Sequence, residues 1–530
     1  MNHRIGGHAV VDQLLAHGTD HAFCVPGESY LAVLDGLHDA RDRIRLITAR
    51  QEGGAAMMAA AYGKLTGRPG VCLVTRGPGA TNASIGVHIA HQDASPMVLL
   101  VGQVPTRHLD RRAFQEVDYR QMFGSLAKDV IEVTEADRIP ELVARAFHTA
   151  CSGEPGPVVV ALPEDVLTTE TSAPVVPPAP PVRPAAAPAD AAAFADALTA
   201  AERPLLVVGG SGWTAEAGER VRAFAETAGI PVATAVRHQD LVDNRSENYA
   251  GTLGLNTTPG LAAAVAEADV IAFLGTRPDA LTVGDFGLLT VPRPAQRILH
   301  VHPDPDVLNR VYRADLAIAA GPAEFAATLP VPPARQRSAW VTRLRDNQLR
   351  GLETAVNTGT DPVPYMTELN ARLPGDAILT AGAGNYTGWA QRHHRFTTYP
   401  SQLAPQAGAM GYGLPAAIAA KLTHPDRAVV AFAGDGCLLM NGQELATAAR
   451  YGLDLLVVVV NNARYGTIRD HQNARYPGRV SGTDLVNPDF VAYARAFGAT
   501  AARAHDPAEF AAALDAHLGR GLALIEVVTE

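Results

Sequence analysis

The stretch RAVVAFAGDGCLLMNGQELATAARYGLDLLVVVVNN, residues 427–462, reads as strand, turn, helix and strand. Two β-branched runs flank an Ala-rich segment, which predicts a βαβ unit with parallel strands. The crossover brings the strands side by side, so we expect Asp435 to lie near Asn462. Carboxylate and amide oxygens suit a hard divalent cation, and the glycines let backbone amides approach a diphosphate. The stretch predicts a metal and diphosphate site; a plain turn with Asp435 as N-cap is the alternative.

Both ends of the chain alternate short apolar runs with Ala-rich segments of helix length, such as residues 52–67 and 441–452. This pattern predicts an α/β protein, with parallel sheets covered by crossover helices. We predict three doubly wound parallel-sheet domains. The predicted strands are HAFCV (21–25), IRLITA (44–49), GVCLVT (70–75), PMVLLVG (96–102), DAILTAG (376–382), RAVVAFA (427–433), DLLVVVV (454–460) and ALIEVV (523–528).

Two breaks in composition divide the chain. A Pro/Ala-rich stretch, residues 172–189, predicts an extended linker. A weaker break, PVPPARQ, follows near residue 330. The predicted domains are therefore residues 1–171, 190–335 and 350–530.

The composition excludes several classes of protein. Hydrophobic residues make up 47% of the 530 residues and charged residues only 18%, which favours buried cores over disorder. No apolar run approaches the ~20 residues that span a bilayer, and the first residues lack the apolar stretch of a signal peptide. A net charge of −10 without charge blocks argues against nucleic acid and anionic membranes as partners. The four cysteines have no metal or redox spacing, so we expect a soluble, cytoplasmic protein.

The residues that follow the predicted strands are the candidates for a ligand site, because ligands of open α/β sheets lie beyond the carboxyl ends of the strands. Two sets of such residues, one in each terminal domain, predict a ligand held between two domains. The first set is Pro26–Glu28, Gln51–Gly53, Arg76–Gly79 and Gln103, and the second is Gly382–Tyr386, Gly434–Gly436 and Asn461–Asn462.

GDG, followed by Asn-Asn with 24 residues between Gly436 and Asn461, resembles the thiamine diphosphate motif. The resemblance extends through most of the chain and is closest to the acetolactate synthase-like branch of that enzyme family. Its other segments are residues 50–82, 110–118 and 407–417. The resemblance implies a first domain that binds the aminopyrimidine, a central domain, and a last domain that binds the diphosphate and Mg²⁺.

The resemblance also implies which residues hold the cofactor. Asp435, the Asn462 side chain and the Arg464 carbonyl are the expected Mg²⁺ ligands. Met410 corresponds to the apolar residue that supports the bent cofactor, with core packing as the alternative. Cys437 stands where the family often has Ser, and an ordinary buried thiol is its alternative. The expected cofactor contacts are Pro26, Glu52, Thr75, Pro78, Asn82, Gly384, Asn385, Tyr386, Gly408, Met410, Gly434, Asp435, Gly436, Cys437, Asn462, Tyr465, Gly466 and Thr467.

Glu52 is the first catalytic candidate. By resemblance, it hydrogen-bonds the aminopyrimidine ring nitrogen and promotes the imino form that activates the cofactor. Glu52 follows a predicted strand and opens an apolar helix, where a carboxylate can be partly desolvated and share a proton. A helix-start carboxylate favoured by the helix dipole is the alternative.

Several residues on the substrate side depart from the family pattern. Glu28 follows Pro-Gly, where decarboxylases of the family place an acid and acetolactate synthases usually have Gly, so it is a second catalytic candidate. An N-terminal helix carboxylate is its alternative. Gln51 replaces the usual His. Arg76 replaces the usual Ser and could bind a substrate carboxylate bidentately, or be a solvated cation at a helix start.

Further departures concern the acceptor. Phe114 and Gln115 stand where decarboxylases of the family carry two His residues, which favours the synthase side, with Gln115 as a further catalytic candidate. His471 stands where acetolactate synthases carry a Trp, which predicts a different acceptor and a catalytic imidazole; a surface His is the alternative. Ile468 is an expected substrate contact beside it.

The sequence does not decide whether the central domain binds FAD, although it favours the absence of FAD. Gly209–Gly212, Leu253–Asn256 and Gly275–Asp279 resemble parts of the family's FAD site, but Leu281 and His302 replace the expected Arg and acidic residue. A Gly-rich turn alone is a weak dinucleotide signal.

The sequence therefore predicts a thiamine diphosphate- and Mg²⁺-dependent enzyme that decarboxylates a pyruvate-like 2-oxo acid and ligates the product to a second carbonyl compound. By resemblance, it acts as a homodimer or homotetramer with active sites between subunits. A decarboxylase, or a lyase or hydrolase that cleaves a hydroxyketone or diketone, is the alternative. Two further alternatives are a cofactor-binding protein that has lost catalysis and a dehydrogenase built on Gly209–Gly212.

Overall fold

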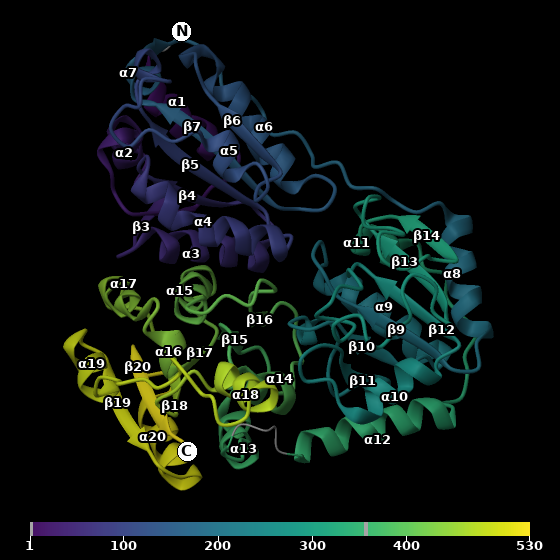
Figure 1. Ribbon diagram of the computed structural model, residues 1–530. Coiled ribbons are helices and arrows are strands. Elements are labelled where there is room, and N and C mark those ends of the chain that lie inside the picture. Colours follow the sequence, from purple (N-terminus) through teal and green to yellow (C-terminus); the bar gives the residue numbers. More distant parts are fainter. Residues whose placement is uncertain (1–3, 355–358, 530) are drawn as a thin grey trace. The chain divides into compact units, whose positions relative to one another are not determined.

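The structure, a computed structural model, describes residues 4–354 and 359–529. It contains three six-stranded sheets, and every strand pairing within them is parallel, as predicted (Figure 1). The chain divides into two compact units, each described separately below. The first runs through Val182 and includes Pro405–Pro425 and Leu439–Leu453; the second comprises Arg183–Ala404, Asp426–Leu438 and the chain from Asp454 onward.

The N-terminal sheet has the strand order β3-β2-β4-β5-β7-β6. Its central strands are buried along their whole length, because helices cover both faces. The strands predicted in this part are confirmed, and β6 and β7 complete the sheet. Its strands are β2 His21–Cys24, β3 Arg45–Thr48, β4 Gly70–Val74, β5 Met97–Gln103, β6 Asp129–Glu132 and β7 Pro157–Pro163. The helices of this region are α1 Gly6–Ala16, α2 Leu31–Asp39, α3 Glu52–Thr66, α4 Pro78–Gln92, α5 Tyr119–Phe123, α6 Ile139–Cys151 and α7 Glu164–Thr168, and the short strands β1 Arg4–Ile5 and β8 Glu170–Thr171 pair separately.

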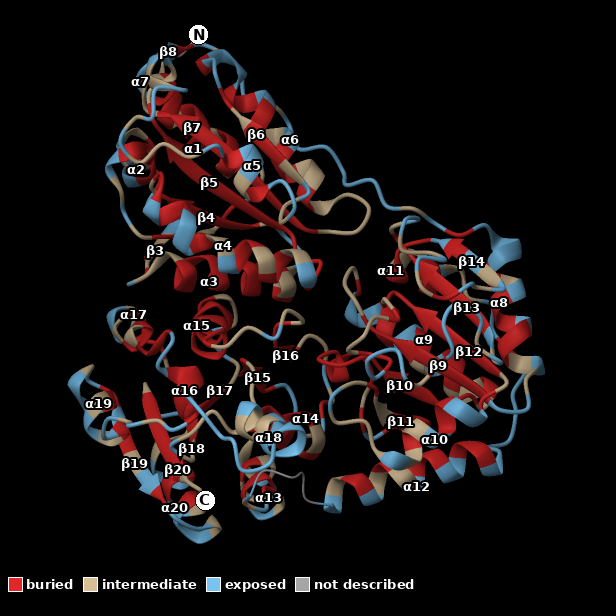
Figure 2. Ribbon diagram, viewed as in Figure 1, coloured by how far each residue is buried: buried red, intermediate tan, exposed pale blue. Residues whose placement is uncertain are grey.

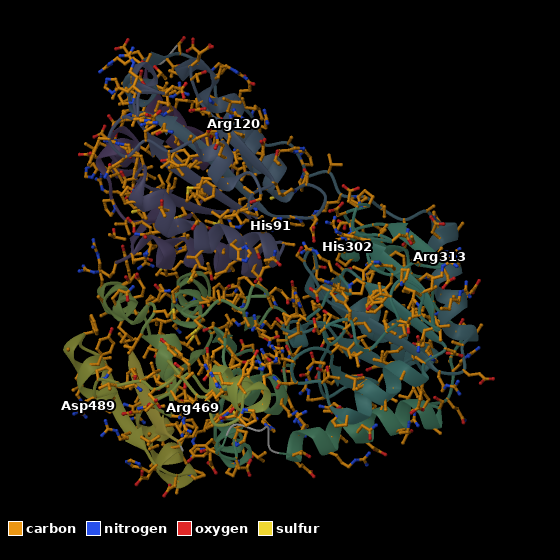
Figure 3. The ribbon with its side chains drawn as sticks, in the orientation of Figure 1. His91, Arg120, His302, Arg313, Arg469 and Asp489 are labelled. Carbon is orange, nitrogen blue, oxygen red and sulfur yellow. The ribbon has the colours of Figure 1, made fainter. Side chains whose placement is uncertain are left out.

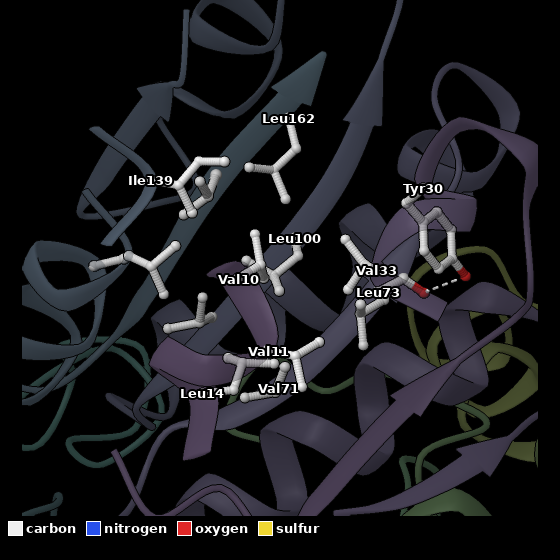
Figure 4. Packing of buried hydrophobic residues seen from close by; sticks show 14 of the residues in the cluster. Val10, Val11, Leu14, Tyr30, Val33, Val71, Leu73, Leu100, Ile139 and Leu162 are labelled. Atoms are coloured by element: carbon white, nitrogen blue, oxygen red, sulfur yellow. Dashed lines mark hydrogen bonds between the residues drawn. The ribbon is translucent and has the colours of Figure 1, made fainter. Parts of the chain in front are cut away.

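One face of this sheet packs against α1, α2 and α6. Figure 4 shows Val10 of α1 beside Leu100 of β5 and Val33 of α2 beside Leu73 of β4, and all four side chains are at most 2% exposed. Each such burial contributes about 1.5–3 kcal/mol. Helices α3 and α4 begin directly after β3 and β4, so both helix starts lie at the carboxyl edge of the sheet.

The central sheet has the order β11-β10-β9-β12-β13-β14 and a hydrophobic core on each face. Helices α8, α9 and α11 cover one face, and α10 and α12 cover the other. Its strands are β9 Pro204–Val208, β10 Val232–Thr234, β11 Tyr249–Thr252, β12 Val270–Leu274, β13 Arg297–His302 and β14 Leu316–Ala319. The helices are α8 Pro188–Ala200, α9 Ala215–Ala228, α10 Pro259–Glu267, α11 Pro322–Thr328 and α12 Ala339–Glu353.

The C-terminal sheet has the order β16-β15-β17-β18-β20-β19, and the four strands predicted in it are confirmed. Figure 2 shows β17 and β18 buried, whereas α18 has no buried residue. The strands are β15 Ile378–Ala381, β16 Gln402–Leu403, β17 Val429–Gly434, β18 Leu456–Asn461, β19 Thr500–Ala504 and β20 Ala523–Val528. The helices around it are α13 Val363–Arg372, α14 Thr387–His393, α16 Asp435–Leu438, α18 Gly466–Arg475, α19 Phe490–Ala496 and α20 Pro507–His517. Helices α15 Gly413–Thr423 and α17 Leu445–Arg450 belong to the first compact unit.

The segment predicted as a linker is extended for most of its length. Residues 172–187 contain no helix or strand, and α8 takes up the last two residues of the predicted linker. Among residues 4–354 and 359–529, no helix is both long enough and apolar enough to cross a bilayer.

Candidate active site

The carboxyl edge of the C-terminal sheet brings together the residues predicted to bind metal. Strands β17 and β18 are neighbours, with Gly434 opposite Val460. Asp435 therefore emerges beside the turn that carries Asn462, and its carboxylate accepts a hydrogen bond from the backbone amide of Ala463. Ala463 has a φ of 52°, which is uncommon for a residue with a side chain. The predicted proximity of Asp435 and Asn462 is thus present in the structure.

The surroundings of Asp435 fit a divalent cation. The residue is 3% exposed, and its Oδ2 accepts a hydrogen bond from Nδ2 of Asn487 at 2.7 Å. Burial raises the pKa of Asp435, and its partners in the described chain are neutral amides. A buried carboxylate without a cationic side chain beside it is costly, and a bound metal ion removes that cost.

Four residues predicted to contact the cofactor cluster at the same edge. Oδ1 of Asn385 accepts a hydrogen bond from the Thr467 hydroxyl at 2.7 Å. A Cβ on Gly466 would lie 3.2 Å from Nδ2 of Asn462 and 3.6 Å from Nδ2 of Asn385. Gly466 therefore allows the two amide side chains to approach the start of α18.

Tyr386 has a structural role that the sequence did not indicate. Its hydroxyl accepts a hydrogen bond from the Gly382 amide at 3.0 Å and donates one to the Cys437 thiol at 3.0 Å. A Cβ on Gly434 would lie 2.8 Å from the Tyr386 ring. Gly384, with a φ of 140°, supplies the backbone conformation that turns the chain toward Tyr386. The phenol therefore holds the ends of β15 and β17 together.

The remaining predicted ligands of this edge lie around α16 and the start of α18. The ring of Tyr465 packs against Gly436, where a Cβ would lie 2.6 Å from the ring carbon Cε1. The Arg464 carbonyl, predicted as a Mg²⁺ ligand, accepts a hydrogen bond from the Gly466 amide at 3.0 Å, which leaves its oxygen a second lone pair.

In the first compact unit, Glu52 is the first residue of α3, at the carboxyl edge of the N-terminal sheet. Its Oε2 accepts a hydrogen bond from Nδ2 of Asn82 at 2.9 Å, so these two predicted residues lie together. Gln51 caps the helix, because its Oε1 accepts a hydrogen bond from the Gly54 amide at 3.1 Å. The helix start thus presents the Glu52 carboxylate half-buried at the edge of the sheet.

Glu444 supports this helix start and was missed by the sequence reasoning. Its carboxylate is fully buried and accepts hydrogen bonds from the backbone amides of Arg50 and Gln51 and from the Thr447 hydroxyl. Burial raises the pKa of Glu444, and these donors partly offset the rise. In the sequence, Glu444 shows only as one residue of a predicted helical segment. Helical periodicity does not identify a hydrogen-bond partner that lies 394 positions away in the sequence.

Arg76 is buried between two carboxylates. It is 8% exposed, its Nη2 lies 3.0 Å from Oε1 of Glu28, and its Nη1 is paired with Oε1 of Glu164. Burial excludes the alternative of a solvated cation. Both terminal nitrogens are occupied by protein carboxylates, and Glu164 was not among the predicted residues.

The loop that carries Phe114 and Gln115 lies against the same turn. A Cβ on Gly77 would lie 2.8 Å from the Gln115 carbonyl oxygen, and the Gly77 amide donates to the Tyr119 hydroxyl at 3.0 Å. Gln115 has a φ of 65°, and Phe114 is 76% exposed. The structure therefore brings Gln115 to Gly77, beside Arg76, and leaves Phe114 projecting from the loop.

The other predicted residues of this edge are also near these turns. The hydroxyls of Thr75 and Ser29 share a hydrogen bond at 2.8 Å, which joins the ends of β4 and β2. Pro78 is the first residue of α4, where a missing amide hydrogen has no cost. Pro26, which is exposed, precedes Gly27, where an added Cβ would lie 2.5 Å from Thr75.

Gly408 and Met410 precede α15 in the first unit. Gly408 is exposed with a φ of 64°, and Met410 is half-buried rather than part of a core. In the second unit, His471 and Ile468 lie on the exposed helix α18, and Ile468 is 53% exposed. Arg469, labelled in Figure 3, ties this helix to Asp484 through an ion pair of 2.5 Å.

The Gly-rich turn of the central domain is tightly filled by the protein itself. A Cβ on Gly210 would lie 1.8 Å from the Gly275 carbonyl oxygen, and the Trp213 indole donates to the Gly209 carbonyl at 2.8 Å. His302, labelled in Figure 3, ends β13 and is 1% exposed. Close packing of two strand ends therefore explains these glycines without a dinucleotide.

Three family comparisons cover the chain in order. Residues 4–122 match the thiamine pyrophosphate enzyme N-terminal TPP-binding domain, residues 191–329 the central domain, and residues 382–527 the C-terminal TPP-binding domain. Thiamine pyrophosphate is another name for thiamine diphosphate, so the carboxyl edges of the N-terminal and C-terminal sheets both carry residues of TPP-binding domains.

Curated relatives agree with this assignment. The chain is 34% identical to the acetolactate synthase large subunit of Parasynechococcus marenigrum over 510 residues, covering 93% of this chain and 82% of the relative. It is 34% identical to that of Corynebacterium glutamicum (94% and 82%) and 32% identical to the isozyme 2 large subunit of Escherichia coli (93% and 89%). On the strength of three matched domains and these relatives, the chain belongs to the thiamine pyrophosphate enzyme family, in its acetolactate synthase-like branch.

Proposed function

We propose that the protein uses thiamine diphosphate and Mg²⁺ to decarboxylate a pyruvate-like 2-oxo acid and to join the remaining acyl unit to a second carbonyl compound. The observation that carries the proposal is Asp435, a buried carboxylate with only neutral partners in the described chain, beside the turn of Asn461 and Asn462. The names of the relatives, acetolactate synthase large subunits, support the same chemistry.

In this proposal, Asp435, Asn462 and the Arg464 carbonyl hold Mg²⁺, and the metal holds the diphosphate. Hard oxygen donors of this kind suit Mg²⁺, which keeps phosphate and water in its other positions. The bound thiamine diphosphate supplies a nucleophilic carbon and an electron sink for the loss of CO₂.

The carboxylates of the N-terminal sheet handle protons. Glu52 is proposed to hold a proton at the aminopyrimidine nitrogen, and Asn82 orients it through the 2.9 Å hydrogen bond. Glu28 is proposed to exchange a proton with the substrate-derived alcohol. Arg76 fixes the position of its carboxylate, and the side chain is 68% exposed and therefore accessible.

We propose an oligomer, a homodimer or homotetramer, with active sites shared between subunits. Apolar side chains are exposed close to predicted cofactor residues: Ile468 follows Thr467 and is 53% exposed, and Met440 packs against Gly411, the residue after Met410, and is 49% exposed. Exposed apolar residues in such positions favour burial by a second subunit. Sedimentation should give at least a dimer, and an active monomer would contradict this part of the proposal.

The proposal includes no FAD, because Gly275 and Trp213 fill the space at the Gly209–Gly210 turn. We also propose that the substrates are small molecules and that the protein is located in the cytoplasm. The wide separation of the four cysteines supports that location, since it is typical of chains without a disulfide framework.

Proton NMR of the products tests the proposal. The full chain is incubated with pyruvate, thiamine diphosphate and Mg²⁺, beside a control without cofactor. Cofactor-dependent release of CO₂ is expected, with acetolactate as the ligation product because pyruvate is the only acceptor in this experiment. Acetaldehyde would indicate a decarboxylase, and unchanged pyruvate together with no thermal stabilisation by the cofactor would refute the proposal.

A further inference from the structure

Glu28, Arg76 and Glu164 form a charged cluster, here called the Glu-Arg-Glu cluster, at the carboxyl edge of the N-terminal sheet. The three residues follow β2, β4 and β7, which end at the same edge. We propose that this cluster selects a carbonyl acceptor without a negative charge, bearing a hydroxyl or ammonium group that hydrogen-bonds to Glu28. The inference rests on the proposed function and specifies its acceptor.

The charges of the cluster do not balance. Arg76 contributes one positive charge and is paired with two carboxylates, one on each terminal nitrogen. With one positive and two negative side chains, the cluster has a formal net charge of −1. Each terminal nitrogen of Arg76 uses one of its two N–H groups for a carboxylate, and the side chain is 10% exposed, so a substrate carboxylate would have to compete with Glu28 and Glu164 for Arg76.

The exposed end of the cluster is the Glu28 carboxylate. The Glu28 side chain is 68% exposed, the Glu164 side chain 34% and the Arg76 side chain 10%. Arg76 hydrogen-bonds to Oε1 of Glu28, and among the described residues no donor reaches Oε2. An incoming molecule therefore meets a carboxylate oxygen that can accept a hydrogen bond, with the positive charge behind it.

The cluster lies on the same turn as the residues proposed to handle protons. Arg76 opens the turn that ends at Gly79, where a Cβ would lie 3.4 Å from Oε1 of Glu52. The backbone amide of Arg76 donates to the Ser29 hydroxyl at 3.2 Å, next to Glu28. Glu28 therefore pairs with one end of a short turn and Glu52 lies close to the other end, so an acceptor near Glu52 also lies in the electric field of Glu28.

The reaction balances with either acceptor. The C1–C2 bond of pyruvate breaks and releases CO₂, a bond forms between pyruvate C2 and the aldehyde carbon, and the aldehyde oxygen takes up one proton. An anionic acceptor is repelled by the net negative charge, whereas a hydroxyl or ammonium group is attracted. A charge at about 6 Å in a partly solvated site changes kcat/KM by about tenfold or more.

Two aldehydes of equal carbon number test the inference. Glycolaldehyde is neutral and bears a hydroxyl, and glyoxylate is an anion. The full chain with thiamine diphosphate, Mg²⁺ and ¹³C-labelled pyruvate is given each one, and CO₂ release and the labelled ligation product are measured. The expected kcat/KM for glycolaldehyde is at least about ten times that for glyoxylate.

Variants assign the preference to the cluster. Glu28→Gln, at an exposed position, and Glu164→Gln each remove one negative charge, so each should reduce the preference for glycolaldehyde severalfold. Glu170→Gln makes the same charge change at an exposed residue of β8 and should leave the preference unchanged. An equal or greater rate with glyoxylate, alongside CO₂ release, overturns the inference alone. Absence of cofactor-dependent CO₂ release overturns the proposed function, and the inference with it.

Discussion

Oε1 of Glu444 lies 3.1 Å from the backbone nitrogen of Arg50, although the two residues are 394 positions apart in the sequence. The same oxygen accepts a hydrogen bond from the Gln51 amide, and Oε2 accepts one from the Thr447 hydroxyl at 2.6 Å. Three donors therefore converge on the buried Glu444 carboxylate, and two of them are the backbone amides of the residues that directly precede Glu52. Glu444, which lies in the stretch of residues 427–462, thus fixes the backbone that presents the Glu52 carboxylate.

Replacing Glu444 tests this support. Glu444→Ala leaves three donors without their acceptor, and each buried unsatisfied donor costs about 1–3 kcal/mol. The free energy of unfolding is therefore expected to fall by about 3 kcal/mol or more, with a loss of turnover because Glu52 shifts. Glu444→Gln keeps one acceptor and should lose less of both. Thermal unfolding and turnover of the two variants check the order, and an undisturbed Glu444→Ala protein would refute the role.

Glu52→Gln tests the proposed proton transfer. The amide keeps the size of the side chain and an oxygen that accepts from Asn82, so the fold and the melting temperature should change little. Turnover should fall by about 10²–10⁴-fold, the usual contribution of a positioned acid or base. Steady-state kinetics with pyruvate, together with circular dichroism, measure both effects. Near-normal turnover would show that Glu52 is not the proton-transferring group.

The sequence predicted the fold well where the strands are apolar runs. All eight predicted strands are present, because parallel strands covered on both faces read as continuous apolar sequence. The edge strand β19, Thr500–Ala504, was not predicted, since TAARA has half-exposed positions and no β-branched run. The helix predicted over residues 441–452 is a 3₁₀ turn followed by α17, Leu445–Arg450, because Glu444 turns back toward the start of α3.

The candidate site was predicted less completely than the fold. The βαβ spacing was enough to bring Asp435 to Asn462, because the register of two neighbouring strands depends on local sequence. Glu164 and Glu444 could not be found in this way, since each meets its partner across a sheet or across hundreds of residues. Tyr386 was predicted as a cofactor contact, and only the three-dimensional structure shows its phenol bonded to Cys437.

Asp435→Asn tests the metal site through stability. Burial raises the pKa of Asp435, so the stability due to its protonated form is present below the ordinary pKa of 3.8 and is lost as the pH rises through the raised pKa. Without Mg²⁺ and cofactor at pH 7, the variant should therefore melt at a higher temperature than the native chain. That difference should shrink as the pH falls toward 3.8.

Adding ligand should reverse the order. Mg²⁺ and thiamine diphosphate at about 100 times their dissociation constant stabilise the native chain by about 2.7 kcal/mol, and the variant by much less. Asp426→Asn, at an exposed position of the same unit, is the matched control and should behave like the native chain. A variant stabilised as strongly as the native chain would exclude Asp435 as a metal ligand.

Gly210→Ala tests whether the Gly-rich turn of the central domain serves packing. Gly210 has a φ of 75°, and an added Cβ would lie 1.8 Å from the Gly275 carbonyl oxygen, a backbone atom that cannot move aside cheaply. Gly18 has a similar φ of 71° with nothing within 4 Å of the added Cβ, so Gly18→Ala measures the conformational cost alone. That cost is about 1–2 kcal/mol, and Gly210→Ala should lose at least about 2 kcal/mol more, because β9 and β12 must separate. Equal losses in thermal unfolding would mean that the strand ends have room between them, and a dinucleotide at this turn would then need to be tested directly by thermal shift with FAD and NAD.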